Sequence, residues 1–422
     1  MPASTPTARS ALLFIFITML IDTIGLGITL PVAPRLIESL AHVDLSTAAR
    51  YGSWLFFSYA LMQFLFAPVI GNLSDRFGRR PVLIVSLTML GIDYVITGVA
   101  PTIGWLFVGR LLSGIAGAAY TTANAYIADV SSAEKRAANF GLVGAAFGIG
   151  FVLGPALGGV IGQYFGPRMP FLVAACLAFA NALFGYFVLR ESLPAERRRK
   201  FDIRRANPVG ALLQLKRYPI LLALVAVFVL LRLGHDANPA VWSYYTMLKF
   251  GWTEAQVGLS LAMIGVCMAI VFGGLTRVVV PRIGESGAVY VGTLLAAVGF
   301  TGYAFATQGW QLYVFIVPFA MMGLATPALT AIMSKNVPSN EQGELQGTLA
   351  SVGSLTSVVA PVIMANLFAH YTRPGASVYF PGAAFLAAAG CMVSAAIVFS
   401  RSAARRKVAA TANQVLGSVT PR

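Results

Sequence analysis

Six ionisable side chains lie inside stretches of the chain that are otherwise apolar, and their types suit proton and cation exchange. They are Asp22, Asp93, Arg110, Arg232, His235 and Asp236. A charged side chain at the centre of a membrane helix costs at least about 2.5–3.5 kcal/mol, so such residues usually face the bundle interior and mark a pathway or a proton relay. The open alternative for each is a structural ion pair or a position near the membrane surface.

Three of these residues lie close together in the segment LLRLGHDANPAVW. Arg232 precedes His235 by three positions and Asp236 by four, so all three share one face of a helix. Imidazole exchanges its proton near neutral pH. We expect His235 and Asp236 to supply the ionisable side chains that proton exchange needs in the C-terminal half of the chain. Alternatively, Asp236 only caps a helix break before Pro239, or it lies close to the outer surface.

The elements that position these residues are long apolar helices. The chain is 57% hydrophobic and 11% charged, against about 25% charged residues in a soluble domain, so most of its surface is expected to face lipid. A membrane span needs about 20 apolar residues. Twelve such runs are predicted at 11–34, 51–70, 82–100, 104–127, 138–162, 169–189, 218–246, 255–276, 287–306, 311–333, 345–369 and 378–400.

A polar, basic segment divides these runs into two groups of six. The predicted organisation is a bundle at 1–189, a cytoplasmic linker at 190–217, a second bundle at 218–400 and a cytoplasmic tail at 401–422. The fold class is therefore an all-α membrane protein with twelve transmembrane helices in two six-helix bundles. The two halves also repeat each other weakly, in GNLSDRFGRRP and GGLTRVVVPRIGE, which suggests a substrate site between related bundles.

The distribution of basic residues predicts the orientation and argues against nucleic acid as a partner. With both termini in the cytoplasm, 23 Lys and Arg residues lie on the cytoplasmic side, five lie on the other side and two lie inside spans. This excess follows the positive-inside rule. The net charge of +15 is thus spread over short loops between apolar helices.

The clearest motif is the segment GNLSDRFGRR between the second and third spans. Its chemistry-bearing residues are Gly71, Asp75, Arg76, Gly78, Arg79 and Arg80, and the two glycines are expected to form a tight turn. The motif resembles the signature of the major facilitator superfamily. That resemblance implies a cytoplasmic gate in which Asp75 pairs in one conformation and releases in the other. The plainer alternative is a solvated basic loop that sets topology.

The fifth span contains GFVLGPALGG, which resembles the pattern of the antiporter branch of that superfamily. Gly150, Gly154 and Gly158 are four residues apart, so they line one helix face and allow close packing. Pro155 is expected to bend the helix, and Gly159 completes the motif. Generic packing of small residues is the alternative.

Further stretches resemble the twelve-helix tetracycline–proton antiporters: LIDTIGLG, GIDY and GRLLSG match in order and spacing. The resemblance implies that Asp22 and Asp93 bind a cationic or metal-chelated drug and couple it to protons, with Arg110 as counter-charge. Gln63 and Asn124 are candidates for hydrogen bonds in the cavity, or for polar contacts between helices.

The second half departs from this family. Its members carry a histidine in the eighth helix and an aspartate in the ninth, where this chain has Met268 and Ala296. The preferred interpretation remains a proton-coupled exporter of a small amphipathic drug, tetracycline-like by resemblance. The alternatives are transport of another small metabolite or sugar, and a non-transporting membrane sensor. No enzymatic activity, cofactor or resident metal is expected. The partners are the lipid bilayer and the cargo, and the protein is expected to be a monomer in the bacterial inner membrane.

Overall fold

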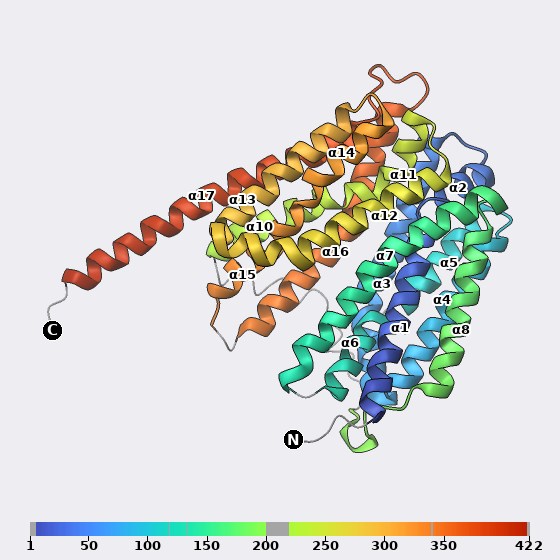
Figure 1. Cartoon of the computed structure of the whole chain (residues 1–422), viewed down its shortest axis with the longest axis horizontal. Helices are drawn as coiled ribbons and strands as arrows, with labels where there is room; N and C mark the ends of the chain where they lie inside the picture. Colours follow the sequence, from blue (N-terminus) through green and yellow to red (C-terminus); the bar gives the residue numbers. More distant parts are fainter. Residues whose placement is uncertain (1–5, 118, 132, 200–218, 339–340, 420–422) are drawn as a thin grey trace. The chain divides into compact units, whose positions relative to one another are not determined.

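The computed structural model describes residues 6–117, 119–131, 133–199, 219–338 and 341–419, and it contains no strand among them. The first half comprises α1 (Pro6–Thr29), α2 (Ala33–Ala41), α3 (Leu45–Phe77), α4 (Arg79–Val99), α5 (Ile103–Ala116), α6 (Ala119–Val130), α7 (Ala133–Phe165) and α8 (Met169–Val188). A short 3-10 helix, η1 (Ala195–Arg197), follows. The second half comprises α10 (Pro219–His235), α11 (Ala237–Phe250), α12 (Glu254–Ile270), the π-helical turn η4 (Val271–Leu275), α13 (Thr276–Phe305), α14 (Gly309–Ala320), α15 (Met322–Lys335), α16 (Gln342–Thr372) and α17 (Ala383–Val419) (Figure 1).

The described helices are consistent with twelve membrane crossings. Ten stretches are long and apolar enough to span a bilayer. One of them, Glu254–Phe305, is 52 residues long and is interrupted at Gly284, which has φ 72° and ψ 166°, so it contains two crossings. The remaining crossing is formed by α5, which is too short alone, together with α6. The all-α membrane fold predicted from the sequence is confirmed.

The first and last predicted runs extend past the ends of their helices, and proline explains both differences. The first run does not continue to residue 34, because α1 ends at Thr29 and α2 begins at Ala33. Pro31 and Pro34 lie at this break; proline lacks a backbone N–H and disfavours helical geometry in the residue before it. The last run does not begin at residue 378, because α17 starts at Ala383, just after Pro381.

The chain folds into two compact units, each made of segments that are not contiguous in sequence. Unit 1 is Met1–Pro208 with Pro239–Val266 and Pro361–Pro381, and unit 2 is Val209–Asn238 with Cys267–Ala360 and Gly382–Arg422. Unit 1 therefore contains segments from both halves of the sequence. The predicted division at the basic linker stays a prediction, and residues 200–217 of that linker lie outside the described residues.

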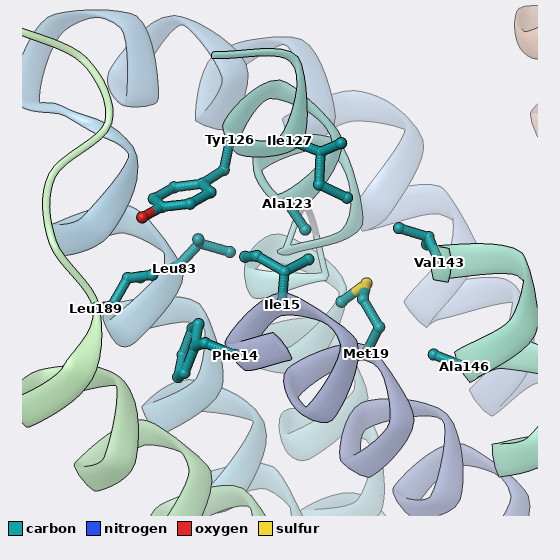
Figure 2. Close-up of a cluster of buried hydrophobic side chains, with 10 residues drawn as sticks. All are labelled: Phe14, Ile15, Met19, Leu83, Ala123, Tyr126, Ile127, Val143, Ala146 and Leu189. Atoms are coloured by element: carbon teal, nitrogen blue, oxygen red, sulfur yellow. The ribbon is translucent and has the colours of Figure 1, made fainter. Parts of the chain in front are cut away.

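A cluster of buried apolar side chains holds α6 in place within unit 1. Ala123, Tyr126 and Ile127 of α6 pack against side chains of α1, α4 and α7 (Figure 2). Each Å² of apolar area that this packing removes from solvent stabilises the position of α6 by about 25 cal/mol. It places the C-terminal end of α6, which carries Asp129, close to the start of α4.

Candidate functional site

A buried ion pair joins α4 to α5. The Nη2 atom of Arg110 lies 2.6 Å from Oδ2 of Asp93, whose side chain is 0% exposed. Thr97 donates a further hydrogen bond from its hydroxyl to Asp93 Oδ1, at 3.4 Å. Gly109 makes room for the carboxylate, because a Cβ at that position would collide with Oδ1. Removing one partner of a buried pair typically costs about 3–5 kcal/mol, so each charge depends on the other.

Two tyrosines that sequence analysis did not single out surround this pair. The hydroxyls of Tyr59 on α3 and Tyr94 on α4 both lie within electrostatic range of Asp22, Asp93 and Arg110. The structure therefore brings the three ionisable residues predicted in the first half into one neighbourhood, with two phenols among them.

Tyr94 also reaches α1, the helix that carries Asp22. A Cβ built on Gly25, one turn beyond Asp22, would lie 2.7 Å from the Tyr94 hydroxyl oxygen. Tyr94 is buried, and within the described residues its hydroxyl has no hydrogen-bond partner. Asp22 is half-buried and forms no ion pair with another described side chain. The neighbourhood thus combines a satisfied charge pair with an unpaired carboxylate and an unpartnered hydroxyl.

Gln63 is a polar contact between helices. Its Nε2 atom donates to the carbonyl of Gly117 at 3.0 Å, and Gly117 is the C-terminal cap of α5, before the break that leads to α6. Asn124 is half-buried on α6. Any additional contact of these two residues with cargo stays a prediction.

In the second half, the residues predicted on the seventh span come together at its break. Asp236 occupies the turn between α10 and α11, and its Oδ1 atom lies 3.1 Å from His235 Nδ1. Its Oδ2 atom accepts a hydrogen bond of 2.9 Å from the hydroxyl of Ser357 on α16. The same hydroxyl accepts a bond of 3.0 Å from Arg232 Nη2. Asp236 therefore lies at a break, as the alternative interpretation supposed, yet both its oxygens engage side chains.

The two positions where this half departs from the related transporters carry no charge in the structure either. Met268 is half-buried on α12, and Ala296 is fully buried on α13. In this half, Arg232, His235 and Asp236 form a cluster of ionisable side chains at the end of α10.

The motif GNLSDRFGRR is mostly helical, and the prediction of a turn at Gly71 is wrong. α3 continues through Gly71 as far as Phe77, and the chain turns at Gly78, which has φ 105°. The Gly78 N–H still donates to the Ser74 carbonyl at 3.1 Å, which explains why the helix persists to that point. The Arg76 guanidinium lies 5.0 Å from the centroid of the Phe77 ring.

Arg79 is the centre of the charge cluster. Its guanidinium contacts Asp75 at 2.6 Å and Asp129 at 3.2 Å. Arg80 donates to the Tyr186 carbonyl at 2.6 Å. In this structure Asp75 is thus paired within its own motif. A gating role, in which Asp75 changes partner, stays a prediction.

Glu191, which sequence analysis missed, caps the N-terminus of α4. Its carboxylate accepts bonds from the backbone N–H groups of Arg79 at 2.8 Å and Arg80 at 3.3 Å. A carboxylate at a helix N-terminus satisfies free N–H groups and interacts well with the helix dipole. A Cβ on Gly78 would collide with this carboxylate, so Gly78 is required both by its positive φ and by this close approach.

The second half repeats this arrangement with the charges reversed. Gly284 also has positive φ, and the next residue, Glu285, contacts Lys335 at 2.6 Å. Arg79 and Asp129 are 50 positions apart, and so are Glu285 and Lys335. The weak sequence repeat therefore corresponds to a repeated ion pair at equivalent positions.

The glycines of α7 allow two helices to approach its backbone. On one face, a Cβ on Gly150, Gly154 or Gly158 would lie 3.0 Å or less from a carbonyl oxygen of α1. On another face, a Cβ on Gly159 would collide with the Glu254 carbonyl of α12, within unit 1.

Pro155 also takes part in this packing. A Cβ on Gly27 of α1 would lie 2.7 Å from the Pro155 ring, and a Cβ on Gly258 of α12 would collide with the Pro155 carbonyl oxygen. The motif is thus a two-sided contact. Within the described residues, no group of three His, Cys, Asp or Glu side chains could hold a metal ion.

Long apolar helices that hold ionisable side chains in their interior are the arrangement of a secondary transporter. The family model described as Major Facilitator Superfamily matches residues 15–361, and the chain belongs to this family. It is 41% identical to the class C tetracycline resistance protein of Escherichia coli, over 86% of this chain and 90% of that protein. It is 38% identical to the class G tetracycline resistance protein of Vibrio anguillarum, over 85% and 91%. Among solved structures, the human organic anion transporter MFSD10 (TETRAN) is similar with a TM-score of 0.69 and 23% identity, over 94% of this chain and 100% of that chain, and supports the fold alone.

Proposed function

We propose that this membrane protein exports a tetracycline-like drug in exchange for protons. The observation that carries the proposal is the Asp93–Arg110 pair, at 2.6 Å and with Asp93 fully buried, together with the unpaired carboxylate of Asp22, which acts on the same two tyrosines. Burial disfavours a charged carboxylate while a neighbouring arginine favours it. The opposition of these two effects makes such a group able to exchange its proton when a cationic drug arrives.

The relatives support the choice of cargo. Two tetracycline resistance proteins match the chain along nearly its whole length. One proton that moves inward through 100 mV supplies about 2.3 kcal/mol, which suffices for modest uphill export. No cofactor is needed, and the drug is expected to travel as a metal chelate.

The remaining assignments belong to the same proposal. His235, Asp236 and Arg232 provide the ionisable function that Met268 and Ala296 do not. The motif around Asp75 and Arg79 acts as the cytoplasmic gate. The chain resides in the bacterial inner membrane, with both termini in the cytoplasm.

Inside-out vesicles from Escherichia coli that expresses the chain provide the test. We expect a pH gradient to drive uptake of tetracycline with Mg²⁺, and an uncoupler to abolish it. Asp93→Asn should reduce the gradient-driven rate at least about tenfold, if the charge contributes the roughly 1.4 kcal/mol that such a factor represents. Glu38→Gln is a matched control, because Glu38 lies outside the spans and is paired with Arg35.

Two outcomes would count against the proposal. Uptake that is insensitive to the uncoupler would remove proton coupling. Transport of a sugar or metabolite in place of tetracycline, measured with a panel of labelled compounds, would favour the alternative facilitator.

A further inference from the structure

Four side chains of unit 2 form a continuous hydrogen-bonded chain between α10 and α16. Arg232 donates to Ser357, Ser357 donates to Asp236, and Asp236 contacts His235, at 3.0, 2.9 and 3.1 Å. Asp236 is 6% exposed, so its carboxylate has little access to solvent. Among these contacts, only that of His235 with Asp236 joins neighbours in sequence.

The identity of the donors determines the direction of this chain. A guanidinium can only donate, and a hydroxyl has one hydrogen to give. Arg232 donates to the Ser357 oxygen, and the Ser357 hydroxyl donates its own hydrogen to Asp236. The Oδ2 atom of Asp236 therefore carries no proton when all three contacts are made.

A proton can be taken up at the other end. His235 Nδ1 and Asp236 Oδ1 are 3.1 Å apart, and one proton between them can reside on either atom while both heavy atoms stay in place. When that proton is present, it neutralises part of the negative charge of the Asp236 carboxylate. The bond from Ser357 then becomes weaker, and Arg232 loses part of its compensating charge.

Little else on the surrounding helices competes for this proton. Residues 345–360 of α16 include no ionisable side chain. On α17, Cys391 lies beside Gly234, since a Cβ on Gly234 would be 3.6 Å from its Cβ; Arg401 is exposed at the far end of the same span. On α15, Lys335 is paired with Glu285.

Arg232 has an unused hydrogen-bonding group. Its Nε atom is buried and has no partner among the described residues. An arginine whose second donor is unused can change its bonding when the charge on Asp236 changes, and Ser357 is the group through which that change reaches α16.

We infer that His235, Asp236, Ser357 and Arg232 form a proton-exchange site of the second half, in which Ser357 transmits the protonation state of Asp236 from α10 to α16. This inference rests on the proposed proton-coupled transport for its purpose. Ser357 is a positioning residue, because it acts through Asp236.

Infrared difference spectroscopy of the purified full-length protein in nanodiscs tests the site without any cargo. A step from alkaline to acidic pH should produce a protonated-carboxyl band that disappears in Asp236→Asn. In Ser357→Ala the frequency of this band should change, because the carboxyl loses one hydrogen bond. In Ser357→Thr, which keeps the hydroxyl, the band should match that of the wild type.

Transport supplies the second measurement. In Ser357→Ala, gradient-driven uptake into inside-out vesicles should fall several-fold with an altered pH profile, while exchange of labelled for unlabelled drug without a gradient persists. Ser357→Thr should restore the wild-type pH profile.

The two proposals fail in different ways. If the infrared bands of Asp236→Asn and Ser357→Ala equal those of the wild type, the inference is overturned whatever the protein carries. If the wild type shows no proton-driven uptake of tetracycline while the bands respond as described, the proposed function fails and the proton site remains.

Discussion

At the scale of single residues, the hydroxyl of Tyr94 is the most unusual group near the Asp93–Arg110 pair. A buried polar atom without a partner costs about 1–3 kcal/mol, and most buried polar groups in proteins are satisfied. This hydroxyl lies beside Gly25, one turn from Asp22. We therefore expect this hydroxyl to find a hydrogen-bond partner at another stage of transport.

Removing this hydroxyl should therefore separate stability from transport. In Tyr94→Phe we expect stability to stay equal or to rise by about 1 kcal/mol, because the ring keeps its packing and the unpartnered hydroxyl is gone. Proton-driven uptake should fall at least several-fold. Thermal unfolding in detergent and uptake into vesicles measure the two quantities.

Tyr126→Phe is the matched control for this substitution. The Tyr126 hydroxyl donates to the Arg190 carbonyl at 2.9 Å, so its loss should lower stability by about 1 kcal/mol and leave transport per folded molecule unchanged. A Tyr94→Phe protein that is less stable and fully active would contradict the interpretation.

At the scale of elements, the glycine motif explains why α7 packs between α1 and α12. Glycine at these positions allows backbones to meet, and no larger residue fits without movement. The spacing of Gly150, Gly154 and Gly158 predicts one contact face, and that face is observed. The second face, which includes Gly159, could not be predicted, because the partner comes from a segment about 95 positions away in sequence.

Two glycine-to-alanine substitutions on α7 should therefore have opposite effects. A Cβ at Gly158 would collide with the Ile28 carbonyl of α1, so Gly158→Ala should lower stability by about 1–3 kcal/mol, the usual cost of overpacking. A Cβ at Gly148 would meet nothing within 4 Å, so Gly148→Ala should be neutral or stabilising by up to about 1 kcal/mol. Thermal unfolding of the two purified variants measures both effects. Equal melting temperatures would show that the close contact at Gly158 does not limit which side chain fits there.

At the scale of the whole molecule, sequence reasoning found the charges more readily than their partners. Asp93, Arg110, Arg232 and Asp236 stand out because ionisable side chains are costly in membrane helices. Ser357 does not, because serine is common in such helices and its role depends on which helix packs opposite.

Turn geometry shows the same limit. Gly71 and Gly78 both belong to the motif, yet only Gly78 adopts positive φ. Which of the two glycines forms a turn depends on the contacts of the next helix, here on the Glu191 carboxylate that caps the N-terminus of α4. The sequence alone therefore indicates where a motif lies, but the contact that selects its turn comes from more than 100 positions away.

The charge-reversed ion pairs show how far the two halves have diverged. In each pair, the first residue directly follows a glycine with positive φ, and the two residues are 50 positions apart. In the first half, Arg79 also binds Asp75, so its charge serves two partners. In the second half, no other ion pair of Glu285 or Lys335 is seen among the described residues.

This difference predicts different tolerance to exchanging the charges. Glu285→Lys alone should weaken the part of α13 that follows the break at Gly284, and the double variant Glu285→Lys/Lys335→Glu should restore stability, since no other ion pair among the described residues depends on either sign. The effect should be at most a few tenths of a kcal/mol, because the Lys335 side chain is 69% exposed and screening is strong, and it should vanish at high salt.

The exchange Arg79→Asp/Asp129→Arg should fail to restore stability, because Asp75 would then face a second carboxylate. Double-mutant cycles on thermal unfolding at low and high salt measure both pairs. Equal restoration in the two halves would mean that Asp75 contributes nothing to the first pair, and the proposed gate would lose its main electrostatic basis.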